Sequence, residues 1–503
     1  MPVSRRRRLR AFGVLLGVAG LLGCGEPAPP ANVVLITIDT LRPDRLSTYG
    51  YRGRRTPGID RLAAEGALFE HARADAPWTT PSMASVLTGT YATTHGLEST
   101  SVNRLRDESL TLAEILAGRH YDTAAVVGSF PLDSIYHLDQ GFAHYDDHFT
   151  KPIWIFPDHQ VQHVESEFSP SLEDRAMFTL WKAANDSRRD DSEVTDAATS
   201  WLDSGHGTPF FLWVHYFGPH GRPDWRVPEA EREKRHVESY DAELAMTDHE
   251  VGRLLEALDA RSLTANTLVI LHADHGESLG EQHYVGHGML LNEATLHVPL
   301  LMRLPGRIEP GRRVARMAQN VDILPTVLAV LGIEAPPGLA GESLLPFVAP
   351  PRFGFWRSRG ADTGEDRVAY METYFPAHRA FAKPVDLPDG THAKLGMIRR
   401  GVRAGRWKYV RTEAHDLLDV PAEKAPRIPE EMKRAAFHEE LYDLAAPTGD
   451  VYDVLAQNPE VAKRMRALLD AQLANAHPPS APAPAPELDA ESRKRLEALG
   501  YGD

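Results

Sequence analysis

A threonine that could act as a nucleophile lies where the sequence predicts the start of a helix. In the segment Trp78–Gly89, Pro81 is well placed for the first helical turn, and small and apolar residues follow it. Thr79 would then lie at the helix N-terminus, where backbone N–H groups and the helix dipole favour an anion. Its hydroxyl could attack a phosphoryl or sulfuryl centre, provided that a metal lowers its pKa. The alternative is that Thr79 or Thr80 only caps the helix, and this segment alone favours the cap.

Carboxylates and an imidazole that could hold a metal follow two apolar runs. Asp39 comes directly after the run 33–38, and Asp274 and His275 come shortly after the run 267–271. Mixed oxygen and imidazole ligation suits zinc, manganese or iron, and it suits calcium where oxygens dominate. Taken alone, the Asp-His pair would more often be a turn. Together with Asp39, it is better interpreted as part of a site for one divalent cation.

Further histidines lie close in sequence to these segments. A single histidine is most often structural, but several beside strand ends are expected to include metal ligands, a leaving-group acid or donors to developing negative charge. They are His95, His215, His220, His283 and His287. His220 and His287 are the main candidates for a second metal or for stabilising the transition state, and the sequence does not separate these roles. His215 and His283 are weaker candidates for the second metal.

Three continuous apolar runs, 33–38, 210–214 and 267–271, predict strands that are buried on both faces of a mostly parallel sheet. Open α/β sheets bind their ligands at the carboxyl ends of such strands, where the polar residues described above are found. Helical patterns such as 238–260 alternate with the strands, so the sequence predicts a doubly wound α/β fold. Farther along the chain the pattern changes, and 401–410 has the alternation of a β-hairpin. We therefore expect a smaller C-terminal antiparallel α+β subdomain.

The composition is that of a globular protein, because 42% of the 503 residues are hydrophobic and 25% are charged. The formal net charge of -15 argues against nucleic acid as a partner, since phosphate backbones bind basic surfaces.

The expected units are a lipoprotein signal peptide (1–23), a tether (24–31), a catalytic α/β domain (32–355), a C-terminal subdomain (356–475), a Pro/Ala-rich linker (476–486) and a tail (487–503).

The N-terminus has the features of an export signal. The basic cluster Arg5–Arg8 precedes the apolar run Ala11–Leu22, which is too short to span a membrane comfortably. The run leads to Gly23-Cys24, which resembles the lipobox of bacterial lipoproteins, whose cysteine carries a lipid. Lipidation of Cys24, the single cysteine, would leave no thiol for a disulfide or a zinc site. We expect a lipoprotein of the bacterial cell envelope, on the periplasmic side or in the outer membrane, held to the membrane through Cys24. The alternative is a chance cysteine in an uncleaved signal.

Taken together, these segments resemble the sulfatase family of the alkaline phosphatase superfamily. The match runs in order from Asn32 to about Leu473, and its order and spacing carry the resemblance because each motif is weak alone. The motifs are Asn32–Asp39, Tyr49-Gly50, Pro81-Ser82, Leu87–Gly89, His95-Gly96, Pro219-His220, Asp274–Glu277, Val298–Leu300, Val321–Thr326, Gly341–Leu344, Arg406–Tyr409 and Glu440–Leu444.

The resemblance implies an alkaline-phosphatase-like sheet and a metal-dependent ester hydrolase. Residue by residue, it implies metal ligands at Asp39, Asp274 and His275, a nucleophile at Thr79, which would also bind the metal, and active-site histidines at His95 and His220. Val321–Thr326 matches a structural segment, so Asp322 is expected to be scaffold.

Several departures from the family bear on the chemistry. Sulfatases have a Cys or Ser at the Thr79 position, which is oxidised to formylglycine, and Thr is not known to be converted in this way. The family's other charged residues fall on uncharged or imidazole side chains here, namely Met83, Ser129, Pro131, Thr40 and His287. A second metal would normally also need a carboxylate, and Gly218 lies where related sequences often have Asp. The sequence therefore leaves a site with a single metal as an alternative.

Threonine nucleophiles are normal elsewhere in the superfamily, in nucleotide pyrophosphatase/phosphodiesterases, phosphonoacetate hydrolases and phosphoethanolamine or lipoteichoic-acid transferases. A cation can replace side-chain positive charge, so we expect Thr79 to attack a phosphodiester or monoester through a covalent phospho-enzyme. The substrate would be a small-molecule, glycan or lipid ester. The alternatives are a sulfatase with an unmodified Thr, a phospho-group transferase acting on envelope lipid or glycan, and a catalytically inactive envelope binding protein.

Overall fold

The computed structural model describes residues 32–99, 103–150, 188–205, 209–220, 229–349, 367–375, 383–386, 392–418, 433–434, 436–447 and 449–476. The expected signal peptide, the tether and the lipidation site Cys24 lie outside these residues. So do the tail and all but the first residue of the expected linker 476–486. In the described part of the chain, no helix combines the length and the apolar character that crossing a membrane would need.

The larger sheet has eight strands in the order β10-β2-β9-β6-β1-β5-β3-β4. All neighbouring pairs are parallel except those that involve β9, which runs antiparallel to β2 and β6. In that order the strands are Arg312–Gln319, Ala67–Arg73, His297–Arg303, Thr267–Ala273, Asn32–Ile38, Phe210–Tyr216, Asp122–Val127 and His144–Asp146. The expected mostly parallel sheet is confirmed.

The central strands β1, β5 and β6 are buried along their whole length, as their continuous apolar runs predict. Their register brings functional groups together. Ile38 of β1 pairs with Ala273 of β6, so the following residues, Asp39 and Asp274, leave the sheet side by side at its carboxyl edge.

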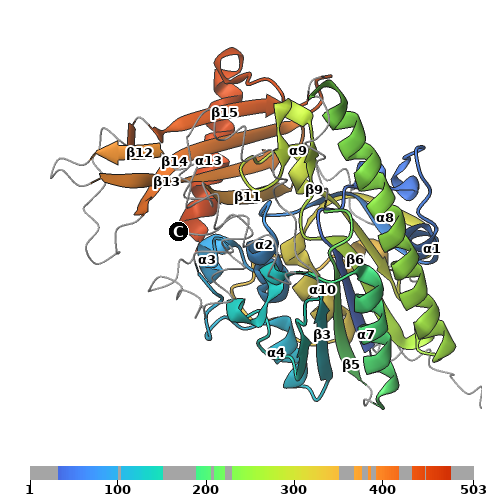
Figure 1. The fold of residues 1–503 in the computed structure, drawn as a ribbon. Coiled ribbons are helices and arrows are strands. Elements are labelled where there is room, and N and C mark those ends of the chain that lie inside the picture. Colours follow the sequence, from blue (N-terminus) through green and yellow to red (C-terminus); the bar gives the residue numbers. More distant parts are fainter. Residues whose placement is uncertain are drawn as a thin grey trace, which may run out of the picture.

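Helices cover both faces of this sheet. Helix α8 (Glu229–Ala260) packs against α1 (Pro57–Glu65) and α7 (Asp191–Asp203), whereas α2 (Thr79–Thr88) packs against α4 (Leu112–Ala117) and α10 (Ile323–Leu331). Figure 1 shows α7 and α8 on one side of the sheet and α2 and α4 on the other. The result is the layered, doubly wound arrangement that the sequence predicts.

A second, antiparallel sheet follows in the order β11-β13-β14-β15, with β12 also pairing with β13. Figure 1 shows it as a separate orange layer crossed by α13. Its elements are β11 Val368–Phe375, β12 Lys383–Asp386, β13 His392–Ala404, β14 Trp407–Leu418, β15 His438–Asp443 and α13 Pro459–Asn475. The expected hairpin at 401–410 is confirmed, since Gly405, with a φ of 56°, lies in the turn between β13 and β14.

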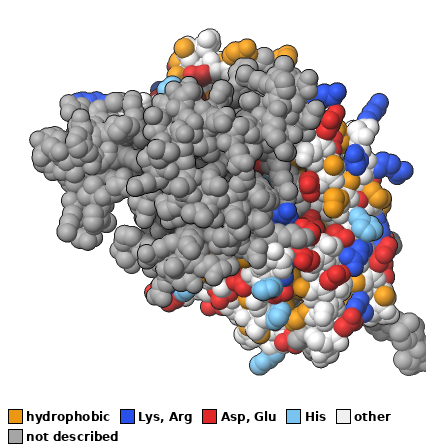
Figure 2. Space-filling view, viewed as in Figure 1, with side chains coloured by type: hydrophobic (Ala, Val, Ile, Leu, Met, Phe, Trp, Pro, Cys, Tyr) orange, Lys and Arg blue, Asp and Glu red, His pale blue; other side chains and the backbone are white. Residues whose placement is uncertain are grey.

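Further short helices and strands connect these elements. They are α3 Ala92–His95, β7 Ser278–Leu279, β8 Val285–Gly286, α9 Glu293–Leu296 and α11 Leu345–Val348. On the described part of the face in Figure 2, acidic and basic side chains are interspersed. That pattern differs from the uniformly basic surface that binds nucleic acid.

Candidate active site

Thr79 is the first residue of α2, and its hydroxyl faces the candidate metal ligands. The cap position belongs to Trp78, which makes no side-chain capping bond. Thr79 Oγ1 lies 3.2 Å from Nε2 of His275, while the neighbouring Thr80 hydroxyl donates to the Pro131 carbonyl at 2.7 Å. Neither threonine side chain therefore caps the helix, and Thr79, which is 4% exposed, points its oxygen into the site.

Asp39, Asp274 and His275 form a buried cluster with the geometry of a metal site. Each offers one ligand atom, and these atoms all lie within 4.8 Å of one another. His275 Nε2 is 3.4 Å from Asp274 Oδ2 and 3.9 Å from Asp39 Oδ1. All three side chains are fully buried, so water does not compensate their charges.

The atoms that a cation would need are left available by the surrounding hydrogen bonds. His275 Nδ1 lies 2.9 Å from the Gly276 carbonyl, so this nitrogen carries the proton and Nε2 presents its lone pair to the cluster. Asp274 Oδ1 accepts hydrogen bonds from the Thr40 and His275 backbone N–H groups, at 3.2 and 2.8 Å. Its other oxygen, Oδ2, and both carboxylate oxygens of Asp39 have no hydrogen-bond partner among the described residues.

The electrostatics of the cluster also fit a cation. Burial, together with the charges of Asp274 and Glu277, raises the pKa of Asp39 well above its ordinary value. Burial lowers the pKa of His275 to about 4, so its imidazole is neutral and able to ligate at neutral pH. Uncompensated buried carboxylates are costly, and coordination of a divalent cation offsets that cost.

Two further side chains hold the backbone of this cluster in place. The carbonyl of Asp274 accepts hydrogen bonds from Ser82 Oγ at 2.7 Å and from Asn320 Nδ2 at 3.1 Å. Ser82 belongs to α2, so this bond ties the helix of Thr79 to the strand end of Asp274. The adjacent Asp322, expected to be scaffold, is bound by the Arg367 guanidinium at 2.5 and 2.6 Å.

A second cluster lies beside the first and contains His220, Glu277 and His287, whose ligand atoms also lie within 4.8 Å of one another. The rings of His275 and His287 have centroids 4.3 Å apart, and those of His220 and His287 are 5.2 Å apart. Sequence reasoning did not select Glu277 as a site residue. The signal that could have identified Glu277 is its position two residues after His275, in the same short motif.

The other histidines selected from the sequence lie elsewhere. His215 is buried beside the first cluster, with Nε2 3.9 Å from Asp39 Oδ2. His95 contacts α2 at Ser85 Oγ, 3.1 Å from its Nε2, and its Nδ1 accepts a hydrogen bond from Leu97 N–H at 3.1 Å. The structure does not describe the side chain of His283, which lies on a short turn before β8.

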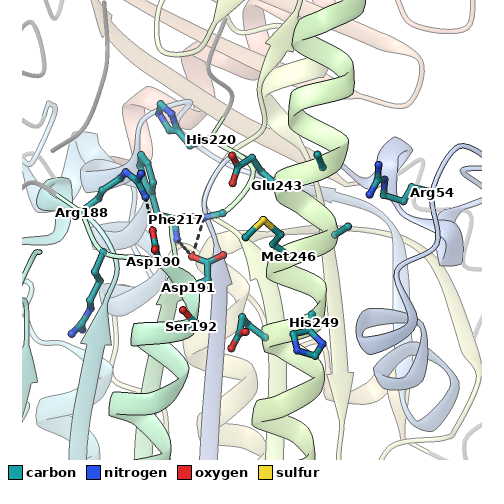
Figure 3. Close-up of a pocket in the computed structure, with 15 residues that line it drawn as sticks. Arg54, Arg188, Asp190, Asp191, Ser192, Phe217, His220, Glu243, Met246 and His249 are labelled. Atoms are coloured by element: carbon teal, nitrogen blue, oxygen red, sulfur yellow. Dashed lines mark hydrogen bonds and ion pairs between the residues drawn. The ribbon is translucent and has the colours of Figure 1, made fainter. Parts of the chain in front are cut away.

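A pocket of about 540 Å³ opens next to the second cluster, with His220 in its wall. Figure 3 shows Asp191 and Phe217 on one side of it and Met246 of α8 on the other. Asp191 accepts hydrogen bonds from the Gly218 N–H at 3.2 Å and from Thr247 Oγ1 at 2.6 Å. A Cβ at Gly218 would lie 2.0 Å from Thr247 Oγ1. Thr247 and Asp191 thus fill the space that a side chain at position 218 would need.

Comparisons with known proteins agree with this fold. A sequence model of the family described as Sulfatase matches residues 31–333. The steryl-sulfatase of Rattus norvegicus is 27% identical over 426 residues, which cover 67% of this chain and 73% of that protein.

Solved structures share the fold. A protein from Bacteroides thetaiotaomicron described as a sulfatase has a TM-score of 0.63 at 19% identity, covering 92% of this chain and 99% of its own. The phosphonate monoester hydrolase of Agrobacterium radiobacter has a TM-score of 0.61 at 21% identity, and the match covers 88% of this chain and 96% of that one.

Members of the family are metal-dependent, and the cluster of Asp39, Asp274 and His275 is a candidate for that metal. The family match extends over more than half of the chain and includes all three of these residues. The chain therefore belongs to the sulfatase family, within the alkaline phosphatase superfamily, and is an ester hydrolase of that family.

Proposed function

We propose that this hydrolase cleaves phosphate esters, monoesters or diesters, with unmodified Thr79 as its nucleophile. The observation that carries the proposal is the position of Thr79 Oγ1, 3.2 Å from His275 Nε2 and at the N-terminus of α2. The metal would be held by Asp39, Asp274, His275 and Thr79. Zinc or manganese suits this mixed oxygen and nitrogen set best, and calcium is an alternative.

A divalent cation bound there would lower the pKa of the Thr79 hydroxyl and offset charge on the phosphoryl group. Thr79 Oγ1 attacks phosphorus in line, the bond from phosphorus to the leaving oxygen breaks, and that oxygen leaves as an alcohol after gaining a proton. Water then attacks the phospho-Thr79 ester and restores the hydroxyl, with release of phosphate from a monoester substrate or of a phosphate monoester from a diester. The backbone N–H groups of the first turn of α2 face the phosphoryl oxygens.

Phosphate is favoured over sulfate by what surrounds Thr79. The position of the formylglycine precursor has a threonine, and the family's arginine position is Met83, which is buried in the hydrophobic core. Imidazoles take the place of fixed positive charge, with His220 and His287 beside the first cluster. We assign to this pair the stabilisation of charge on the phosphoryl group, either directly or through a cation that the two imidazoles hold. The fold is also that of a phosphonate monoester hydrolase, so it accommodates a phosphorus centre.

Hydrolysis of a sulfate ester by unmodified Thr79 is the second candidate, because a curated relative is a sulfatase.

We further propose that the protein works in the bacterial envelope, anchored by lipid at Cys24, on a small-molecule, glycan or lipid ester. The basic cluster, the short apolar run and the single cysteine at its end support this location.

The test uses the full-length chain in detergent, stripped of metal and reloaded with zinc, manganese or calcium. Aryl phosphodiester, phosphomonoester and sulfate esters are assayed in parallel, with Thr79→Ala as the control. Phosphate-ester turnover that vanishes in Thr79→Ala supports the proposal. Dominant sulfate-ester turnover would replace it with the second candidate, and no turnover with any metal would favour a binding protein.

A further inference from the structure

An irregular segment of backbone, residues 288–292, accepts hydrogen bonds from side chains of the second sheet. The segment belongs to no helix or strand. Thr373 Oγ1 of β11 donates to the Gly288 carbonyl at 2.5 Å, and Lys408 Nζ of β14 donates to the Leu291 carbonyl at 2.8 Å. Both donors are almost fully buried. A buried carbonyl outside a helix or strand needs such a donor, so the second sheet holds the segment in its shape.

The side chains that meet this segment share one face of the second sheet. Thr373 of β11 pairs with Arg399 of β13. Arg403, four residues farther along β13, pairs with Lys408 of β14. Because side chains alternate along a strand, residues four apart point to the same face. Arg399 Nη1 also contacts the Met289 carbonyl, at 3.4 Å, so neighbouring strands all direct polar groups toward one segment.

Glu293, directly after this segment at the start of α9, is held by charges from both sheets. Its Oε2 lies 2.7 Å from Arg403 Nη1 and 2.8 Å from Nη2 of Arg73, which belongs to the larger sheet. Its N–H donates to Asp450 Oδ2 at 2.6 Å, and Lys408 Nζ lies 2.6 Å from the same oxygen. Figure 1 shows α9 against the second sheet. Breaking a buried ion pair leaves an uncompensated charge, which is costly, so this end of the segment has little freedom to move.

The other end of the segment contacts the residue beside the proposed nucleophile. Gly288 lies against Trp78, since a Cβ at Gly288 would lie 2.1 Å from Trp78 Cζ2. The rings of Trp78 and His287 have centroids 5.5 Å apart, and Trp78 directly precedes Thr79 in the chain. A shift of Gly288 would therefore change the place of the His287 imidazole relative to the nucleophile.

We infer that the second sheet positions His287 for the reaction, and that Thr373 is its positioning residue. The hydroxyl of Thr373 holds the carbonyl of Gly288, the residue next to His287. The inference rests on the proposed function for the contribution that His287 makes to turnover, because Thr373 acts through His287 and not on the substrate. A change at Thr373 should therefore alter turnover through His287 and through no other group.

A double-mutant cycle tests this role. It uses full-length protein in detergent and whichever ester of the panel the protein hydrolyses. Thr373→Val nearly keeps the shape of the side chain and removes its hydroxyl. We expect kcat and kcat/KM to fall together, by roughly 10- to 100-fold, and Thr373→Ser, which keeps the oxygen, to restore the rate. In a His287→Ala background, Thr373→Val should cause no further loss, whereas a purely structural effect would lower the rate in both backgrounds.

Thr412→Val is the matched control. Thr412 of β14 pairs with Arg399 from the side opposite to Thr373. It is 5% exposed, and its hydroxyl has no hydrogen-bond partner among the described residues. The substitution removes a buried hydroxyl from the same face of the sheet and leaves the donors to the segment 288–292 in place, so kcat should not change.

Hydrogen exchange gives a readout that needs no turnover. Amides in 288–293 should exchange faster in Thr373→Val than in Thr412→Val or the unaltered chain, because local opening sets their exchange rate. Amides elsewhere should be unaffected, which shows that the fold is kept. Unchanged exchange in 288–293 would overturn the inference, and so would an equal fractional loss of kcat from Thr373→Val with and without His287.

The outcomes also separate this inference from the proposed function. Sulfate-ester turnover that follows the expected cycle would contradict the proposed function and support the positioning role of Thr373. Phosphate-ester turnover that depends on Thr79 but not on His287 would overturn the positioning role and leave the nucleophile in place.

Discussion

Thr79 Oγ1 lies 3.2 Å from Nε2 of His275, although 196 positions separate the two residues in the chain. The contact arises because His275 follows β6 at the carboxyl edge of the sheet, where α2 begins. Ser82 Oγ of α2 also donates to the Asp274 carbonyl at 2.7 Å. The helix start and the strand end are thus joined by two bonds, which fix the hydroxyl relative to the carboxylates.

Removal of the Thr79 hydroxyl tests its role directly. Thr79→Ala should lower kcat for a phosphate ester by roughly 10³-fold or more, because residual catalysis comes only from binding and electrostatics. Thr79→Ser should retain a measurable part of the rate, since it keeps the oxygen. The matched control is Thr80→Val, which removes the neighbouring hydroxyl, the donor to the Pro131 carbonyl, and leaves that of Thr79 in place. Equal rates for Thr79→Ala and the unaltered enzyme would eliminate Thr79 as nucleophile.

His95 is expected to stabilise the helix of Thr79 rather than to bind metal. Burial lowers its pKa to about 3, so it is neutral, and both ring nitrogens are used, by Ser85 and by Leu97 N–H. His95→Ala should lower the free energy of unfolding by about 1–3 kcal/mol, because it leaves buried polar groups unsatisfied. Denaturant unfolding measures this. The metal content should not change, and a loss of metal would contradict this role.

The sequence predicted the main residues of the candidate metal cluster because their positions depend on local pattern. Continuous apolar runs mark the buried strands β1 and β6, and the ends of neighbouring parallel strands meet at one edge. Asp39 and Asp274 were therefore found. Glu277 was not selected, because it follows a glycine in an irregular segment after the strand end.

The sequence also could not predict which cluster His215 would join. It belongs to β5, where successive side chains point to opposite faces of the sheet. The side chain of His215 lies on the face where its Nε2 approaches Asp39 Oδ2. His220 lies five residues later, past the strand end, where the backbone is free of that alternation. Spacing alone could not decide which histidine joins which cluster.

Asp75 should make stability depend on pH. Burial raises its pKa to about 7, above the unfolded value of about 3.9. The folded state therefore binds the proton more tightly, and the contribution of Asp75 to stability is lost as pH rises from about 4 through 7. Asp75→Asn removes this loss. In thermal unfolding it should be more stable than the unaltered chain at pH 8, by up to a few kcal/mol, and similar to it at about pH 4, near the unfolded pKa. Parallel pH profiles would contradict this assignment.

Gly276, between His275 and Glu277, leaves no room for a side chain. A Cβ there would lie 2.2 Å from the Ala294 carbonyl oxygen, so Gly276→Ala must displace backbone and should destabilise the fold by about 1–3 kcal/mol. Gly252→Ala in α8 is the matched control, because its nearest new contact is at 3.9 Å. The control should be stabilised by up to about 1 kcal/mol through helix propensity. Equal melting temperatures for the two variants would show that the backbone around Gly276 can shift at little cost in stability.

His287→Lys distinguishes the two roles that the sequence left open for this residue, metal ligand and direct stabiliser of the phosphoryl charge. The sulfatases that this chain resembles have a lysine at the position. Lysine supplies a positive charge, but at neutral pH its ammonium group has no lone pair for a cation. If His287 is a ligand, His287→Lys should lose one cation per chain and lose phosphate-ester turnover as fully as His287→Ala does. If the imidazole acts by its charge, His287→Lys should retain a large part of the turnover that His287→Ala loses. Metal analysis and kinetics on the same preparations separate these outcomes. We expect the first because the ligand atoms of His220, Glu277 and His287 all lie within 4.8 Å of one another.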